Sequence, residues 1–168
     1  LESRYKKVGM VVVKEEVRAQ IVQVARKIFT RYGFRKTTME EIAEATRKGK
    51  SSIYYYFKSK EEIFKAVVEK EAEELKADLD KTLHEEGIPL EKLKAYILFR
   101  LHHVRTVANF YAALKEESLS HMDFILEIRR RFDQQELQVV REILEEGMQE
   151  GTFQINSSEI GAIAIATM

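Results

Sequence analysis

Apolar residues recur at steps of three and four positions along most of this chain of 168 residues, which contains a single proline. Val17, Ile21, Val24 and Ile28, for example, fall on one face of an α-helix. Seven glycines and one proline provide few of the turns that a β-rich fold needs, and 45% apolar residues suffice for a substantial core. The sequence therefore predicts an all-α protein, with ordered helices from about residue 15.

The segment from Thr37 to Lys60 predicts two short helices joined by a tight basic turn. Thr38 and Glu41 have the spacing of a capping box, which satisfies free backbone N–H groups where a helix begins. Gly49 lies in the turn and can adopt the dihedral angles that a sharp reversal requires. Two short helices in this arrangement are typical of a helix-turn-helix DNA-binding motif.

The second short helix carries side chains suited to the major groove of DNA. Ile53 and Phe57 lie four positions apart and are expected to point inward. The outer surface is then left with small hydroxyl residues and tyrosines: Ser51, Ser52, Tyr54 and Tyr55. Lys50 at the helix start can reach guanine or a phosphate, and Lys60 begins the following helix, where an anion is favoured. We therefore expect double-stranded DNA as a partner.

The distribution of charge agrees with this expectation. Residues 1–60 hold fifteen Lys and Arg against six Asp and Glu, whereas residues 61–168 hold thirteen against twenty-two. A basic surface favours approach to a phosphate backbone, although the same asymmetry is also compatible with a solvated surface that has no partner. We predict a DNA-binding domain over residues 1–60 and a second, helical domain over residues 61–168.

The segment from Thr37 to Phe64 closely resembles the DNA-binding segment of TetR-type transcriptional regulators, with its Thr-Thr entry, Ile-Tyr-Tyr-Tyr-Phe recognition helix and Lys-Glu-Glu-Ile-Phe entry to the next helix. The resemblance implies a homodimeric repressor in which residues 61–168 form a divergent helical effector-binding and dimerisation domain, whose last two long helices form the dimer. By the same resemblance, DNA phosphates are held by Thr38, Ser52, Tyr54 and Lys60, bases face Lys50, Ser51 and Tyr55, and Tyr56 contacts phosphate or packs.

The turn departs from the family pattern. Where relatives have a small residue followed by an apolar one, this chain has Arg47 and Lys48. Lys48 adds a charge that can bind phosphate, but it replaces a side chain that joins the two short helices. An alternative function is therefore a helical dimeric ligand-binding or scaffold protein whose helix-turn-helix no longer binds specific DNA.

The rest of the chain predicts further helices. Ser59 and Glu62 have the spacing of a second capping box, before a charged connecting helix that reaches Glu86. Apolar residues are abundant from Leu90 to Leu119, either as one helix or as two with a break between residues 106 and 109. The helix from Phe124 to Gln149 and a final helix from Ser157 or Ser158 are the expected dimerisation helices.

The resemblance to TetR-type regulators also implies an effector pocket between helices, lined by the aromatic-rich segment from Tyr96 to Phe124, since ligand pockets are mostly apolar with a few polar groups. The ligand is an unknown, small and largely apolar effector that releases the repressor from a near-palindromic operator. An ordinary helical core would have the same composition, and nearby Arg100 can either meet an anionic group or lie on the surface. The candidate lining residues are Tyr96, Phe99, Leu101, His103, Phe110, Tyr111, Leu114 and Phe124.

Several other classes of function find no support in the sequence. There is no cysteine for a disulfide, a thiol nucleophile or a Cys-type zinc site. His102 and His103 are adjacent on a helix and point to different faces, so no metal site and no cofactor are expected. No nucleophile, base and orienting group can be assembled into an enzyme site. Without a secretory or membrane-spanning segment, a cytoplasmic protein is the expectation.

Overall fold

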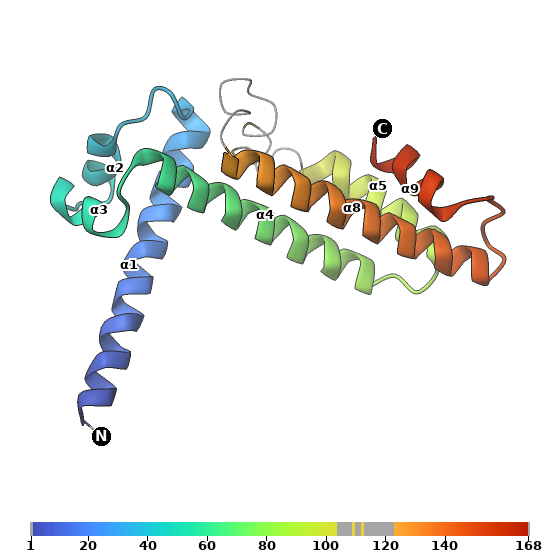
Figure 1. The fold of residues 1–168 in the computed structure, drawn as a ribbon, viewed down its shortest axis with the longest axis horizontal. Helices are drawn as coiled ribbons and strands as arrows, with labels where there is room; N and C mark the ends of the chain where they lie inside the picture. The colour runs from blue at the N-terminus through green and yellow to red at the C-terminus, as the bar shows by residue number, and fades with distance from the viewer. Residues whose placement is uncertain (1, 104–108, 110–111, 113–122, 168) are drawn as a thin grey trace. The chain divides into compact units, whose positions relative to one another are not determined.

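The computed structural model describes residues 2–103, 109, 112 and 123–167. All the regular elements that these residues form are α-helices (Figure 1), which confirms the predicted all-α fold class for this part of the chain. The helices are α1 (Glu2–Tyr32), α2 (Met39–Ala45), α3 (Lys50–Tyr56), α4 (Lys60–His84), α5 (Pro89–His103), α8 (Asp123–Gln149) and α9 (Ser158–Ala166). Among them, no helix is long and apolar enough to cross a membrane.

The chain divides into two compact units, Leu1–Lys70 and Glu71–Met168. The helix α4 contributes residues to both units, as expected for the charged connecting helix. The functional domains expected at residues 1–60 and 61–168 stay a prediction, because compactness alone does not show what each part of the chain does.

The helix α1 begins at Glu2, so the expectation that ordered helix starts near residue 15 was wrong. Residues 2–14 lack the apolar stripe from which that start was inferred. They contain no proline, and Gly9 is the one residue among them that strongly disfavours a helix. Adding residues to an existing helix is easier than nucleating one, so the amphipathic part of α1 can extend toward the N-terminus.

Three phenylalanine rings form the centre of the first unit. Phe29 of α1, Phe34 of the following loop and Phe64 of α4 lie with ring centroids 4.8 to 6.0 Å apart, and all three are buried. Such aromatic pairs stabilise a core beyond the contribution of their buried area. Phe57 at the end of α3 is buried as well, so the inward orientation predicted for Phe57 is confirmed.

The turn between α2 and α3 reverses at Arg47, not at Gly49. Arg47 has φ +55°, and the Arg47 and Lys48 N–H groups donate to the carbonyls of Glu44 and Ala43 at 2.9 and 3.0 Å. This is the Schellman pattern of helix termination, whose left-handed position is usually glycine. Gly49 instead has extended dihedrals, φ −65° and ψ 147°, immediately before α3. The role predicted for Gly49 was therefore wrong.

The second unit contains the later part of α4 together with α5, α8 and α9. Its core includes Tyr96, Val140, Leu144 and Ala162, all less than 5% exposed. The helices α8 and α9 approach closely at Gly161, where a Cβ atom would lie 2.9 Å from a methyl group of Leu144. The helix bounds confirm the predicted long helix to Gln149 and the final helix capped by Ser157. Most of the break expected between residues 106 and 109 lies outside the described residues.

Candidate functional site

The helix α2 begins with the predicted capping box. The Thr38 hydroxyl accepts from the Glu41 N–H at 3.2 Å, and the Glu41 carboxylate accepts from the Thr38 N–H at 2.8 Å. The box predicted at Ser59 is half formed, because Ser59 accepts from the Glu62 N–H whereas the Glu62 carboxylate accepts from the N–H of Lys58. The starts of α2 and α4, the helices before and after α3, are thus stabilised by local side chains.

The helix α3 has a buried and an exposed side, as predicted. Ile53 is fully buried and Phe57 is 2% exposed, so these two residues fasten α3 to the first unit. Tyr54 and Tyr55 are 43% and 68% exposed. Ser51 is exposed too, while Ser52 and Tyr56 are half-buried. The exposed side is short, polar and aromatic, which suits entry into a major groove.

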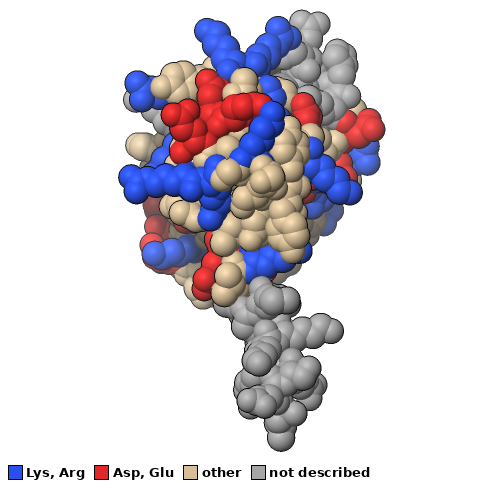
Figure 2. Space-filling model, turned by 90° about the vertical axis from the view of Figure 1, so that its left-hand side faces the viewer, with Lys and Arg blue, Asp and Glu red and all other residues tan. Residues whose placement is uncertain are grey.

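Figure 2 shows the face of the molecule on which α2 and α3 lie. Lysine and arginine side chains project around an uncharged area, and carboxylates gather beside it. The surface that carries α3 is therefore mixed in charge, with cations at its margins.

The side chain of Lys50, at the start of α3, interacts with two neighbouring residues. Its ammonium group forms an ion pair with Glu40 of α2 and lies 5.9 Å from the centre of the Tyr54 ring. The hydrogen bond from Lys50 lowers the pKa of the Glu40 carboxyl, and the same bond raises the pKa of Lys50. A base or phosphate that binds Lys50 must compete with Glu40, a relationship that sequence reasoning missed.

Two cations of α1 reach toward α3 and its end. The Lys14 ammonium lies 5.1 Å from the centre of the Tyr55 ring, and the Arg18 guanidinium lies 4.8 Å from that of Phe57. Neither residue was a predicted site residue. Tyr55 also packs edge to face against Tyr56, with ring centroids 5.0 Å apart. The most exposed tyrosine of α3 is thereby oriented by two neighbours.

The remaining predicted DNA contacts differ in exposure and in their partners. Lys48 is half-buried, and Thr38 is exposed although its hydroxyl takes part in the capping box. Lys60 is half-buried, and its ammonium donates to the Phe34 carbonyl at 2.9 Å. Thr38 is the N-cap of α2, and the other eight predicted residues belong to α3, the turn before it or the start of α4.

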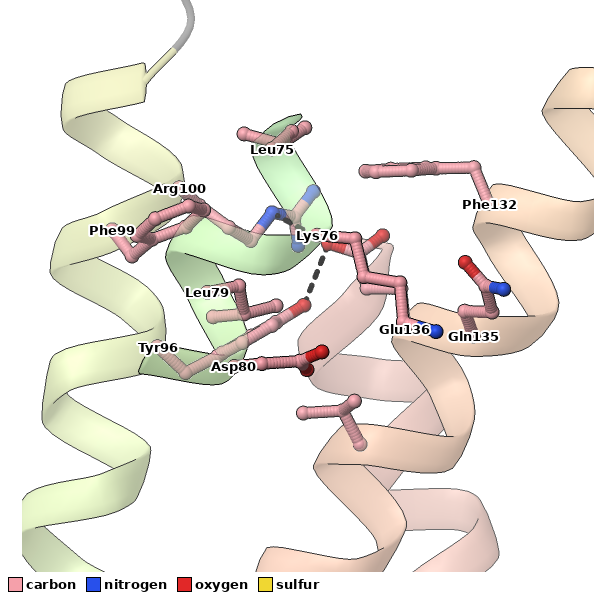
Figure 3. Close-up of a pocket in the computed structure, with 11 residues that line it drawn as sticks. Leu75, Lys76, Leu79, Asp80, Tyr96, Phe99, Arg100, Phe132, Gln135 and Glu136 are labelled. Atoms are coloured by element: carbon pink, nitrogen blue, oxygen red, sulfur yellow. Dashed lines mark hydrogen bonds and ion pairs between the residues drawn. The ribbon is translucent and has the colours of Figure 1, made fainter. Parts of the chain in front are cut away.

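The second unit contains a cavity of about 50 Å³ between α4, α5 and α8. Figure 3 shows Tyr96, Phe99 and Arg100 on one side and Phe132, Gln135 and Glu136 on the other. Six aliphatic or aromatic residues and five charged or amide residues line it: Leu75, Lys76, Leu79, Asp80, Tyr96, Phe99, Arg100, Phe132, Gln135, Glu136 and Val139.

Two of the predicted pocket residues, Tyr96 and Phe99, line this cavity, whereas Leu101 and Phe124 do not. Leu101 is 72% exposed, because α5 turns that position away from the other helices. Phe124 is half-buried at the start of α8. The side chain of His103 and the residues Phe110, Tyr111 and Leu114 lie outside what the structure describes.

A polar cluster lies at one wall of the cavity. The Tyr96 hydroxyl donates to Glu136 Oε1 at 2.7 Å, and Arg100 Nε lies 3.1 Å from the same oxygen. Arg100 Nη1 also donates to the carbonyls of Ile165 and Ala166 at the end of α9. Burial raises the pKa of Tyr96 above its usual range, and burial also raises the pKa of Glu136. Glu136 was not predicted, because nothing local in the sequence relates it to Tyr96.

The comparisons agree with the helix-turn-helix geometry. Residues 21–67 match the family model of bacterial regulatory proteins of the tetR family. A transcriptional regulator from Cytophaga hutchinsonii, solved by crystallography, is 32% identical with a TM-score of 0.76, over 88% of this chain and 75% of that one. The chain belongs to the TetR family. The predicted resemblance is thus confirmed, and this TetR-family chain is a helix-turn-helix transcriptional regulator.

Other relatives of this TetR-family regulator differ more in sequence. The transcriptional regulator YhgD of Bacillus subtilis is 27% identical over 150 residues, which cover 86% of this chain and 76% of YhgD. The regulator AibR, solved in complex with isovaleryl coenzyme A and operator DNA, is 18% identical with a TM-score of 0.69, over 90% of this chain and 82% of AibR. At that identity AibR shares the fold alone.

Proposed function

We propose that this TetR-family regulator is a ligand-responsive repressor that binds a near-palindromic operator as a homodimer and is released by a small, largely apolar effector. The observation that carries the proposal is the two-sided helix α3, with Ile53 and Phe57 buried and Tyr54 and Tyr55 exposed. Its site of action is then the chromosome in the cytoplasm, and its role is regulatory and not enzymatic.

The roles of individual residues in DNA binding follow from their positions. Lys50, Ser51 and Tyr55 face bases, because they lie on or beside the exposed side of α3. Hydroxyl and ammonium groups at the margins hold phosphates and fix the orientation of α3 in the groove. These phosphate-binding residues are Thr38, Lys48, Ser52, Tyr54 and Lys60, with Tyr56 in phosphate contact or packing.

The dimer forms through α8 and α9. Large apolar side chains remain exposed on these helices in the single chain: Leu126 at 46%, Ile160 at 71% and Ile163 at 48%. A two-fold interface that buries such residues is the commonest form of homo-oligomer. Two copies of α3 would then engage successive major grooves about 34 to 36 Å apart.

The effector binds in the cavity beside Tyr96 and Phe99. A volume of about 50 Å³ has room for a few water molecules, whereas ligand sites usually measure roughly 300 Å³ or more. Ligand entry therefore requires the helices around the cavity to separate. The helix α4 lines the cavity and begins at Lys60, shortly after α3 in the chain. A displacement of α4 would therefore change the spacing of the two α3 helices in the dimer.

Selection of genomic DNA fragments by the purified chain, followed by sequencing and footprinting, tests the proposed function. We expect enrichment of a near-palindrome whose half-sites are separated by about one helical turn. Failure to protect any such site, at every salt concentration tried, would contradict DNA-specific binding.

A second candidate is a dimeric ligand-binding or scaffold protein that no longer binds specific DNA. The ion pair between Lys50 and Glu40 favours it, because it sets a carboxylate beside the start of α3. A gel-shift assay at moderate salt separates the two functions. Retention of one DNA sequence over others supports the repressor, and equal weak retention of all sequences supports the second candidate.

A further inference from the structure

The cavity beside Tyr96 is lined by the carboxylate of Glu136, whose two oxygens differ in their contacts with the described residues. The side chain of Glu136 is 10% exposed and lines the cavity. Both of its polar partners, the Tyr96 hydroxyl and Arg100 Nε, contact Oε1. Within the described part of the chain, no hydrogen bond reaches Oε2. An acceptor on a side chain that is only 10% exposed is expected to bind a donor, either water or a ligand group.

The charges of this cluster are already balanced. Arg100 lies beside the Glu136 carboxylate and its guanidinium also donates to two carbonyls of α9 at 3.1 and 3.2 Å. A cation bound at Oε2 would face the Arg100 charge, and an anion would face Glu136. Either would leave an excess buried charge, which is unfavourable in a medium of low polarity.

The Tyr96 hydroxyl cannot offer a second donor to a ligand, because its proton is used in the 2.7 Å hydrogen bond to Glu136. The other residues that line the cavity are of two kinds. Lys76, Asp80 and Gln135 are exposed, so their polar groups can be solvated, whereas Leu75, Leu79, Phe99, Phe132 and Val139 offer apolar groups. The complementary ligand thus has an apolar body and a single donor group.

We propose that the effector is an uncharged apolar molecule with a hydroxyl group, an alcohol or a phenol, whose O–H donates to Glu136 Oε2. This inference rests on the proposed function of the cavity as the effector site. Arg100 acts as a positioning and specificity-determining residue, because it neutralises Glu136 and thereby disfavours charged ligands of either sign.

Three probes of equal chain length test this ligand class on the full chain: hexan-1-ol, hexanoate and hexylamine, titrated at pH 7 with ligand-observed NMR. Hexanoate is then an anion and hexylamine a cation. We expect hexan-1-ol to bind at least about tenfold more tightly than either charged probe. Tighter binding of a charged probe, or no binding of hexan-1-ol, overturns the proposal.

Two variants reverse the charge balance and should reverse the preference. Glu136→Gln leaves Arg100 without its carboxylate, so hexanoate should gain affinity relative to hexan-1-ol. Arg100→Gln leaves Glu136 without its cation, so hexylamine should gain. Lys94→Gln is the control, because Lys94 lies on the same helix α5 in an exposed pair with Glu91 and does not line the cavity. If the two variants fold and rank the three probes as the wild type does, the role of Glu136 and Arg100 is overturned. If both variants unfold, the wild-type ranking of the probes alone decides on the ligand class.

DNA binding measured on the same preparations separates the two proposals. Intact sequence-specific DNA binding without a preference for hexan-1-ol removes the ligand class and leaves the regulator. A preference for hexan-1-ol without any specific DNA binding leaves the ligand class and removes the proposed function.

Discussion

The ammonium group of Lys60 donates a 2.9 Å hydrogen bond to the carbonyl of Phe34 and lies 4.3 Å from the centre of the Phe34 ring. The same lysine is a proposed phosphate contact at the start of α4. One side chain thus lies between the aromatic core of the first unit and the surface that is expected to face DNA.

Replacing Lys60 with alanine should therefore have two effects. We expect a loss of about 1 kcal/mol in the free energy of unfolding, since a hydrogen bond from a charged group is removed. We also expect weaker binding to all DNA sequences, with a salt dependence reduced by about one unit. Urea denaturation and fluorescence anisotropy over a salt series measure the two effects.

Lys58→Ala is the matched control for Lys60. Lys58 is exposed, and its backbone N–H, which the substitution retains, donates to Glu62. Its replacement should leave stability nearly unchanged. If Lys60→Ala lowers stability but leaves the salt dependence as it was, Lys60 has a structural role alone.

The left-handed conformation of Arg47 predicts that glycine is preferred there. Arg47→Gly should stabilise the chain by about 1 kcal/mol, because a non-glycine residue is strained at φ +55°. Gly49→Ala should be tolerated, since φ at Gly49 is −65° and a Cβ would lie 3.9 Å from the nearest atom, Ser51 Oγ. Urea denaturation of both variants is the measurement, and the opposite order of stabilities would contradict the turn geometry.

The conformation of this turn could not be predicted from the sequence, although neighbouring features could. The capping box of Thr38 and Glu41 and the inward pair Ile53 and Phe57 were predicted, because each is a relationship between residues three or four apart on a helix. Which of Arg47 and Gly49 adopts the left-handed conformation was not predicted, because glycine tolerates that conformation but does not require it.

The polar clusters could not be predicted for a related reason. Lys50 and Glu40 are ten residues apart, and Tyr96 and Glu136 are forty apart. Such contacts depend on how the helices pack, which no local pattern specifies. The family resemblance directed attention to the aromatic residues of α5, but Glu136 and Phe132 have the appearance of ordinary positions on an amphipathic helix.

Removing the carboxylate beside Lys50 should strengthen DNA binding. Glu40→Gln frees the ammonium of Lys50 and removes a negative charge from the surface that carries α3. We expect a several-fold gain in affinity at low salt and a steeper salt dependence, by up to about one unit. Glu44→Gln, on the same helix and also exposed, is the control and should give a smaller gain, because no ion pair of Lys50 is broken. Equal gains in the two variants would show that the Lys50 pair has no specific role.

Tyr55 should influence which DNA sequence is bound more than how strongly salt weakens the binding. Tyr55→Ala removes a 68% exposed ring that Lys14 and Tyr56 orient. We expect an altered consensus in a selection from random DNA and a salt dependence close to that of the wild type. Tyr55→Phe retains the ring and should retain the consensus if the ring contacts a thymine methyl group. A consensus that is the same in all three proteins would exclude Tyr55 from base contact.

The exposed apolar residues of α9 predict that the dimer is needed for DNA binding. Ile163 is 48% exposed on a helix that packs against α8, and Ile163→Lys introduces a charge at the proposed two-fold interface. We expect a monomer in light scattering and a loss of DNA affinity of at least about a hundredfold, because the two half-sites are no longer bound together. Ile88→Lys is the control, since Ile88 is 55% exposed in the loop between α4 and α5. A variant at Ile163 that stays dimeric, or a monomer that keeps full affinity for the palindrome, would show that the interface or its function lies elsewhere.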